Sequence, residues 1–203
     1  MKSFPMVLGL LLGLCQCVGC QVNNSSNDLV IQGLNQDYNR VQVESCEFAN
    51  DAITMKVQGQ TLRIAPVSLA NNPFKGKTLF LKARKVLAPN GPIHYLEFYN
   101  GEELFLIVSD NARRNSQFLT DFSISPGKVI GEDQQTKRSW TELEIKTPQQ
   151  KLIVKPGTMT RLKNNNVTWG LILIGSSLDF SVSKDKAEEI PEFSADFVVY
   201  RLK

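Results

Sequence analysis

Residues 93–109, which read IHYLEFYNGEELFLIVS, decide the fold class of this chain. Two runs rich in aliphatic and aromatic residues flank the pair Asn100-Gly101, and this pair tolerates the positive φ angles of a type I′ turn. The stretch therefore predicts a β-hairpin. Residues 105–108 are apolar at every position, which predicts a strand that is covered on both faces.

Most of the remaining chain has the two-residue period that is typical of strands. Apolar and polar residues alternate over 53–57 and again over 61–64, with Gly59 in the turn between them. Further strand-like runs occupy residues 40–49, 79–84, 140–146, 151–155, 158–163, 167–175, 178–183 and 196–202. We expect ten or more strands between residues 29 and 202. Weak helix signals, each enough for one or two turns, occur only at 110–120 and 184–190.

Many short strands without crossover helices indicate an all-β fold. We expect a two-sheet antiparallel sandwich of jelly-roll type, formed by a single domain over residues 29–203. An up-and-down β-barrel that holds an apolar ligand is the alternative. Hydrophobic residues make up 42% of the chain and charged residues 21%, which suits one globular core.

The N-terminal residues have the composition of an export signal. Lys2 precedes an uncharged apolar run over residues 4–15. This run has the length of a signal-peptide core and is shorter than the roughly 20 residues of a membrane-spanning helix. We therefore expect a signal peptide over residues 1–19.

Val18-Gly19-Cys20 follows that run, and a polar stretch continues to residue 28. These residues resemble the lipobox of bacterial lipoprotein precursors, although Cys17 stands where leucine is usual. The resemblance implies that Cys20 carries acyl chains such as palmitate, and that residues 20–28 form a lipid-anchored flexible spacer. The protein would then be held to a membrane of the cell envelope on its extracytoplasmic side. Ordinary signal-peptide cleavage would instead give a secreted protein.

The residue types argue against several functions. A formal net charge of +3 with scattered basic residues gives no footprint for nucleic-acid binding. The chain's one histidine, His94, alternates with Leu96 and Phe98 and is expected to be structural. One histidine cannot support a zinc site of the usual ligands, and no phosphate-binding loop motif occurs. We therefore expect no metal and no cofactor.

Carboxylates are the remaining candidates for catalysis, because a pair of them can act as acid and base in glycoside hydrolysis. The candidates are Glu97, Glu102, Glu103, Glu142 and Glu144. Their positions on polar strand faces and beside a turn predict solvated side chains. We therefore expect no enzymatic activity.

Aromatic residues provide the candidate ligand-binding site. Trp140 lies on the polar side of its strand, and Tyr95 and Tyr99 share a strand face with Glu97. Exposed rings on a sheet face form flat platforms that stack on sugars or on a partner. Alternatively, these rings cover the edge of the sandwich or fill the interface with the second sheet. Trp169 alternates with apolar residues and is expected in the core.

Four segments, 77–86, 139–148, 178–183 and 196–202, follow the order of elements in jelly-roll carbohydrate-binding modules. The resemblance lies in Ala83-Arg84 at the end of one strand, in Trp140 at the start of another, and in Asp179 or Asp196 in a closing strand. It implies a non-catalytic protein that binds polysaccharide or glycan. An envelope lipoprotein that scaffolds or assists a membrane protein complex is the alternative function.

Overall fold

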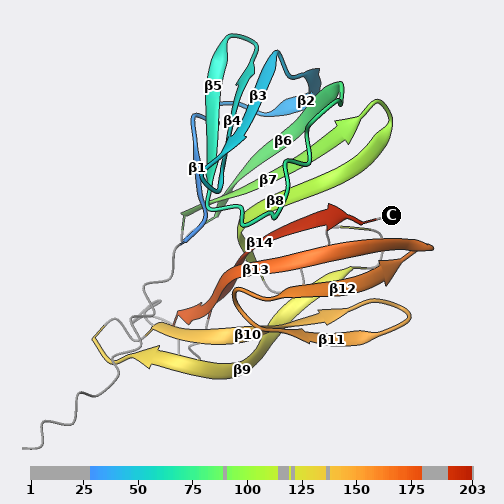
Figure 1. Ribbon diagram of the computed structural model, residues 1–203. Helices are drawn as coiled ribbons and strands as arrows, with labels where there is room; N and C mark the ends of the chain where they lie inside the picture. Colours follow the sequence, from blue (N-terminus) through green and yellow to red (C-terminus); the bar gives the residue numbers. More distant parts are fainter. Residues whose placement is uncertain are drawn as a thin grey trace, which may run out of the picture.

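A computed structural model describes residues 28–88, 91–113, 119, 122–135, 138–179 and 192–202. These described residues form fourteen β-strands and no helix (Figure 1). The strands are β1 (Val30–Gln32), β2 (Tyr38–Gln42), β3 (Ser45–Ala49), β4 (Ala52–Val57), β5 (Gln60–Ala65), β6 (Leu79–Ala88), β7 (Gly91–Asn100), β8 (Glu103–Arg113), β9 (Ser123–Asp133), β10 (Arg138–Lys146), β11 (Lys151–Val154), β12 (Met159–Asn164), β13 (Val167–Asp179) and β14 (Glu192–Arg201).

The strands form two antiparallel sheets that pack as a sandwich. The smaller sheet has the order β1-β5-β4-β3. The larger sheet has the order β11-β10-β13-β14-β8-β7-β6-β2, with β12 beside β13 and β9 beside β10. The expected all-β antiparallel sandwich is confirmed, and the barrel alternative is wrong because the sheets do not close.

The larger sheet carries a hydrophobic core on each face. On one face the smaller sheet packs over β6, β7 and β8, in a first core that includes Phe98, Leu106 and Val108. On the other face β9, β10 and β11 fold beneath β12, β13 and β14 (Figure 1). The second core between these layers includes Ile107 and Phe197. The prediction that residues 105–108 are covered on both faces is confirmed, since all four are at most 7% exposed.

Tight two-residue turns connect several hairpins, and their φ angles correct one prediction. Asn100 pairs with Glu103, so the loop consists of Gly101 and Glu102. Only Gly101 has a positive φ (57°), which is the pattern of a type II′ turn rather than the expected type I′ turn. The type I′ pattern occurs instead at Asn165-Asn166, where φ is 48° and 64°.

The remaining predictions concern the weak helices and the N-terminal segment. Residues 110–113, where a helical turn was expected, continue β8 as a strand. Residues 184–190 lie outside the described residues, as do residues 1–27 with Cys20. The signal peptide, the lipidation and most of the spacer therefore stay predictions. Within the described ranges, no helix is long and apolar enough to cross a membrane.

Candidate functional site

A polar pocket of about 250 Å³ opens at one end of the larger sheet. We call it the end pocket. Ends of four strands, β8, β10, β13 and β14, supply its side chains, and the entering segment Asp28–Leu29 forms part of its wall. The pocket therefore joins residues from both ends of the domain.

The strand register builds this pocket from rows of polar side chains. Arg138 of β10 lies opposite Asp179 of β13, and Asp179 lies opposite Glu192 of β14. Residues directly opposite on adjacent strands share a face, with Cβ atoms about 5 Å apart. The next row across β13, β14 and β8 consists of Ser177, Ser194 and Arg113.

Two β-bulges shape the floor of the end pocket beside Asp196. Relative to β14, both β8 and β13 contain one extra residue at this level. A bulge leaves a residue unpaired in the ladder and turns the side chains that follow it to the other face. In β8 the turned residue is Asn111, whose φ is 48°. The N–H of Asn111 is therefore free to bond a side chain rather than a strand.

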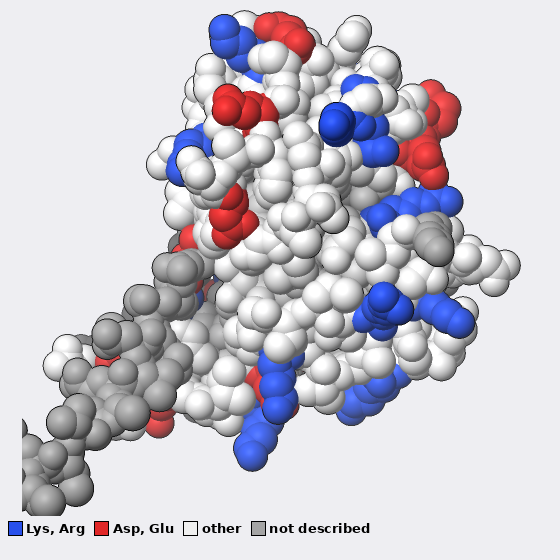
Figure 2. Space-filling model, viewed as in Figure 1, with Lys and Arg blue, Asp and Glu red and all other residues white. Residues whose placement is uncertain are grey.

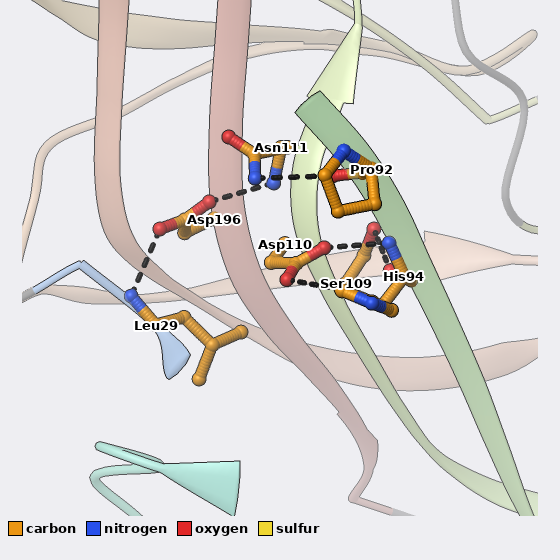
Figure 3. A network of polar contacts seen from close by, with 7 residues as sticks. All are labelled: Leu29, Pro92, His94, Ser109, Asp110, Asn111 and Asp196. Carbon is orange, nitrogen blue, oxygen red and sulfur yellow. Dashed lines mark hydrogen bonds and ion pairs between the residues drawn. The ribbon is translucent and has the colours of Figure 1, made fainter. Parts of the chain in front are cut away.

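The carboxylate of Asp196 accepts that N–H at 2.8 Å and also accepts the N–H of Leu29 at 2.9 Å. Figure 3 shows Asp196 between these two partners, with Asp110 beside it. Burial raises the pKa of Asp196 to about 6, and the charges of Asp110 and Asp28 also raise it, although the two N–H donors act in the opposite direction. Asp196 thus fixes the start of the domain to its last strand.

The raised pKa of Asp196 gives stability a pH dependence. Between about pH 4 and pH 6 the folded chain keeps a proton that the unfolded chain releases, so the free energy of unfolding is expected to fall as pH rises. Replacing Asp196 by Asn removes this titration. The decrease in the free energy of unfolding between pH 4 and pH 7 should then be smaller than in wild type by roughly 2–3 kcal/mol. Urea unfolding at pH 4 and pH 7 measures it. Glu47→Gln, an exposed carboxylate on β3, is the control, and equal slopes in Asp196→Asn and wild type would contradict the assignment.

His94 lies beside this network but is turned away from the end pocket. Its Nδ1 is 2.7 Å from Oδ2 of Asp110, and its side chain is buried. The hydroxyl of Ser109 donates to the backbone oxygen of His94, at 3.2 Å, rather than to the imidazole. The three residues therefore do not form a nucleophile arrangement, which supports the structural role expected for His94.

Tyr95 and Tyr99 share a face of β7 with Glu97, as the sequence predicts. Tyr99 donates its hydroxyl to Glu97, and burial together with this bond raises the pKa of Tyr99 to about 12. Glu97 is only 8% exposed, so the expectation of a solvated Glu97 is wrong. The guanidinium of Arg40 lies 5.1 Å from the centre of the Tyr99 ring, and that of Arg84 lies 5.9 Å from the centre of the Tyr95 ring. Arginines of the chain itself thus already contact both rings.

Trp140 is placed elsewhere. Trp140 lies opposite Ser177, at the end of the row that Ser177 forms with Ser194 and Arg113, and its side chain is partly buried. Tyr95 instead packs against the second core, on the other face of the larger sheet. The structure therefore does not bring Trp140 together with Tyr95 or Tyr99. The indole Nε1 of Trp140 is buried and has no hydrogen-bond partner among the described residues.

Sequence reasoning found only part of the end pocket. Asp179 and Asp196 are the pocket residues that the resemblance indicates, whereas Trp140, indicated by its strand face, does not line the pocket. Arg113 and Arg138 look like ordinary loop charges in the sequence, because strand pairing alone brings them together. One local signal was available: Asp196 stands directly before the apolar run Phe197-Val198-Val199.

No protein-family model matches the chain, and no curated protein or solved structure shows significant similarity to it.

Proposed function

We propose that this chain is a non-catalytic, lipid-anchored extracytoplasmic binding protein, and that its end pocket holds one unit of a polysaccharide or glycan. The observation that carries the proposal is the pair of polar rows in the pocket. They place arginines, carboxylates and serine hydroxyls on adjacent strands around one cavity.

This mixture of groups suits sugar hydroxyls. A hydroxyl donates one hydrogen bond and accepts others, so it is best held between acceptors such as Asp179 and donors such as Arg138. The volume of about 250 Å³ is below the roughly 300–1,000 Å³ of pockets that bury drug-sized ligands, which favours a single small polar unit. Trp140 does not line the pocket, but it lies directly opposite the lining residue Ser177 on the adjacent strand.

The buried groups argue against hydrolysis by a nucleophile with a histidine base. Both oxygens of Asp196 already accept backbone N–H groups, so this carboxylate serves the fold. His94 is held by Asp110 and does not line the pocket. Among the described residues lining the pocket, no nucleophile stands beside a histidine base.

The cellular location rests on the sequence. The apolar run over residues 4–15 and the cysteine at position 20 support export and acylation. The alternative function, a scaffold for a membrane protein complex, needs one continuous apolar patch. The exposed aliphatic side chains instead are spread over β1, β6, β9, β11 and β12, so no specific observation favours it.

The test is a titration of the full chain with cellohexaose, chitohexaose and mannohexaose, followed by calorimetry and by tryptophan fluorescence. Trp169 is only 5% exposed, so Trp140 is the expected reporter. Binding of at least one sugar is expected. The double variant Arg138→Ala/Glu192→Gln should weaken it at least tenfold, because charged hydrogen bonds are lost. Trp140→Ala should abolish the fluorescence change.

The matched control is Arg63→Ala/Glu47→Gln, which makes the same changes on the exposed outer side of the smaller sheet. It should bind as wild type does. A chain that binds none of these sugars, or a control that weakens binding as much as the pocket variant, would reject the proposal.

A further inference from the structure

A second cavity, of about 460 Å³, opens at the opposite end of β14. We call it the C-terminal cavity. The loop that carries Lys75 and Lys77 forms one side, and the ends of β8 and β14 form the other. It shares no lining residue with the end pocket. The two sites can therefore be tested independently.

One wall of the C-terminal cavity is aromatic. The ammonium of Lys77 lies 5.3 Å from the centre of the Phe105 ring. The Tyr200 ring lies against Gly170 of β13, where a Cβ atom would come within 2.7 Å of Cζ of Tyr200. Gly170 therefore makes the room that lets this ring lie flat over the sheet. Tyr200 is partly exposed and provides an apolar surface beside the cations, whereas Phe105 is only 7% exposed.

The other groups in the cavity are mainly basic. Arg201 is held by Glu103 at 2.6 Å. Neither Lys75 nor Lys77 forms an ion pair with another described residue. Lysines that lack a carboxylate partner leave a net positive potential at the mouth of the cavity, which attracts anions.

The positive surface continues onto β12. Arg161 lies opposite Gly170, and Gly170 lies opposite Tyr200. Arg161 is therefore on the same face of the sheet as Tyr200, and the backbones of these two residues are two strand spacings apart, about 10 Å. Lys163 follows on that face, and Met159, which is 44% exposed, lies at the other end of β12. Figure 2 shows Lys and Arg on both halves of the molecule. Near β11, Lys146 and Lys151 pair with Glu144, and Lys155 pairs with Glu142.

We propose that the C-terminal cavity binds the phosphate ester of an anionic amphiphile, such as a phospholipid headgroup. Lys75, Lys77 and Arg201 would surround the phosphate, because cations with several N–H donors match its oxygens. The partly exposed ring of Tyr200 would contact the apolar part of the ligand. Arg161 and Lys163 would lie over neighbouring headgroups, as basic residues do at an anionic leaflet.

The test is calorimetry of the full chain with three soluble probes: dihexanoylphosphatidylglycerol, dihexanoylphosphatidylcholine and glycerol phosphate. We expect the phosphatidylglycerol to bind more tightly than the other two. Lys75→Ala/Lys77→Ala should weaken it about 25-fold, roughly fivefold for each lysine. Lys56→Ala/Arg63→Ala removes two exposed cations from the smaller sheet and should have no effect.

Equal binding of the two phospholipids, or an equal effect of both double variants, would overturn the proposal. Glycerol phosphate binding as tightly as the phosphatidylglycerol would support the anion site and assign it to soluble phosphate esters. Arg138→Ala/Glu192→Gln in the end pocket should leave phospholipid binding unchanged, which separates this proposal from glycan binding.

Discussion

Replacing Phe98 by alanine is expected to lower the free energy of unfolding by about 3–5 kcal/mol. The Phe98 side chain is fully buried in the first core. Its ring lies 5.6 Å from that of Phe74, which in turn lies 6.0 Å from Phe105. Removal leaves a cavity beside the Phe74 ring, and surrounding strands of a sandwich can close it only in part. Urea unfolding at pH 7 measures the loss.

Phe80→Ala is the control for this prediction. Phe80 lies on the neighbouring strand β6 but is only partly buried, and its ring faces the guanidinium of Arg40 at 6.0 Å. Phe80→Ala should lower the free energy of unfolding by less than half as much as Phe98→Ala does, because less apolar area is exposed to water. Equal losses for the two variants would show that the first core does not have the packing described.

Gly33→Ala is expected to cost at least about 2 kcal/mol and to detach β1 from β5. Gly33 has a φ of 81°, which a residue with a Cβ rarely adopts. A Cβ there would also lie 2.2 Å from the backbone oxygen of Thr61, so the two strands would have to move apart. Urea unfolding and hydrogen exchange at Ile31, which pairs with Ile64, measure the effect.

Gly59→Ala separates the two causes. Gly59 has a similar φ of 75°, but a Cβ at this position would meet no atom within 4 Å. It should therefore show only the conformational cost, about 1 kcal/mol. If Gly33→Ala and Gly59→Ala lose equal stability, the contact with Thr61 is not important for the attachment of β1.

Local pattern was enough to predict most of the strands and their inward faces, but β9 (Ser123–Asp133) lies outside every predicted run. Alternation placed Leu143 and Ile145 inward, and both are buried. Trp169 lies in the core, as its apolar neighbours on β13 predict. The hairpin at Asn100-Gly101 was also correct, although its loop is displaced by one residue because Asn100 still pairs in the ladder.

Features that depend on how strands pack over a face of the larger sheet, or on how distant strands pair, could not be predicted. Glu97 was expected to be solvated because it is polar on an alternating strand. The sequence does not show that tyrosines and the second core would cover that face. Likewise, Asn111 lies in a bulge that only the pairing with β14 defines. The end pocket depends on hydrogen bonds between residues far apart in the sequence. Asn111 and Asp196 are separated by 85 positions, and Leu29 and Asp196 by 167 positions, so no local pattern contains these contacts.

The two cores on opposite faces of one sheet also constrain how the chain is made. Strands β8 and β14 supply a wall to each core, and β14 comes after all the other described strands in the sequence. A nascent chain therefore cannot complete either core until β14 has left the ribosome. Such late, long-range closure slows folding and exposes apolar strands during synthesis.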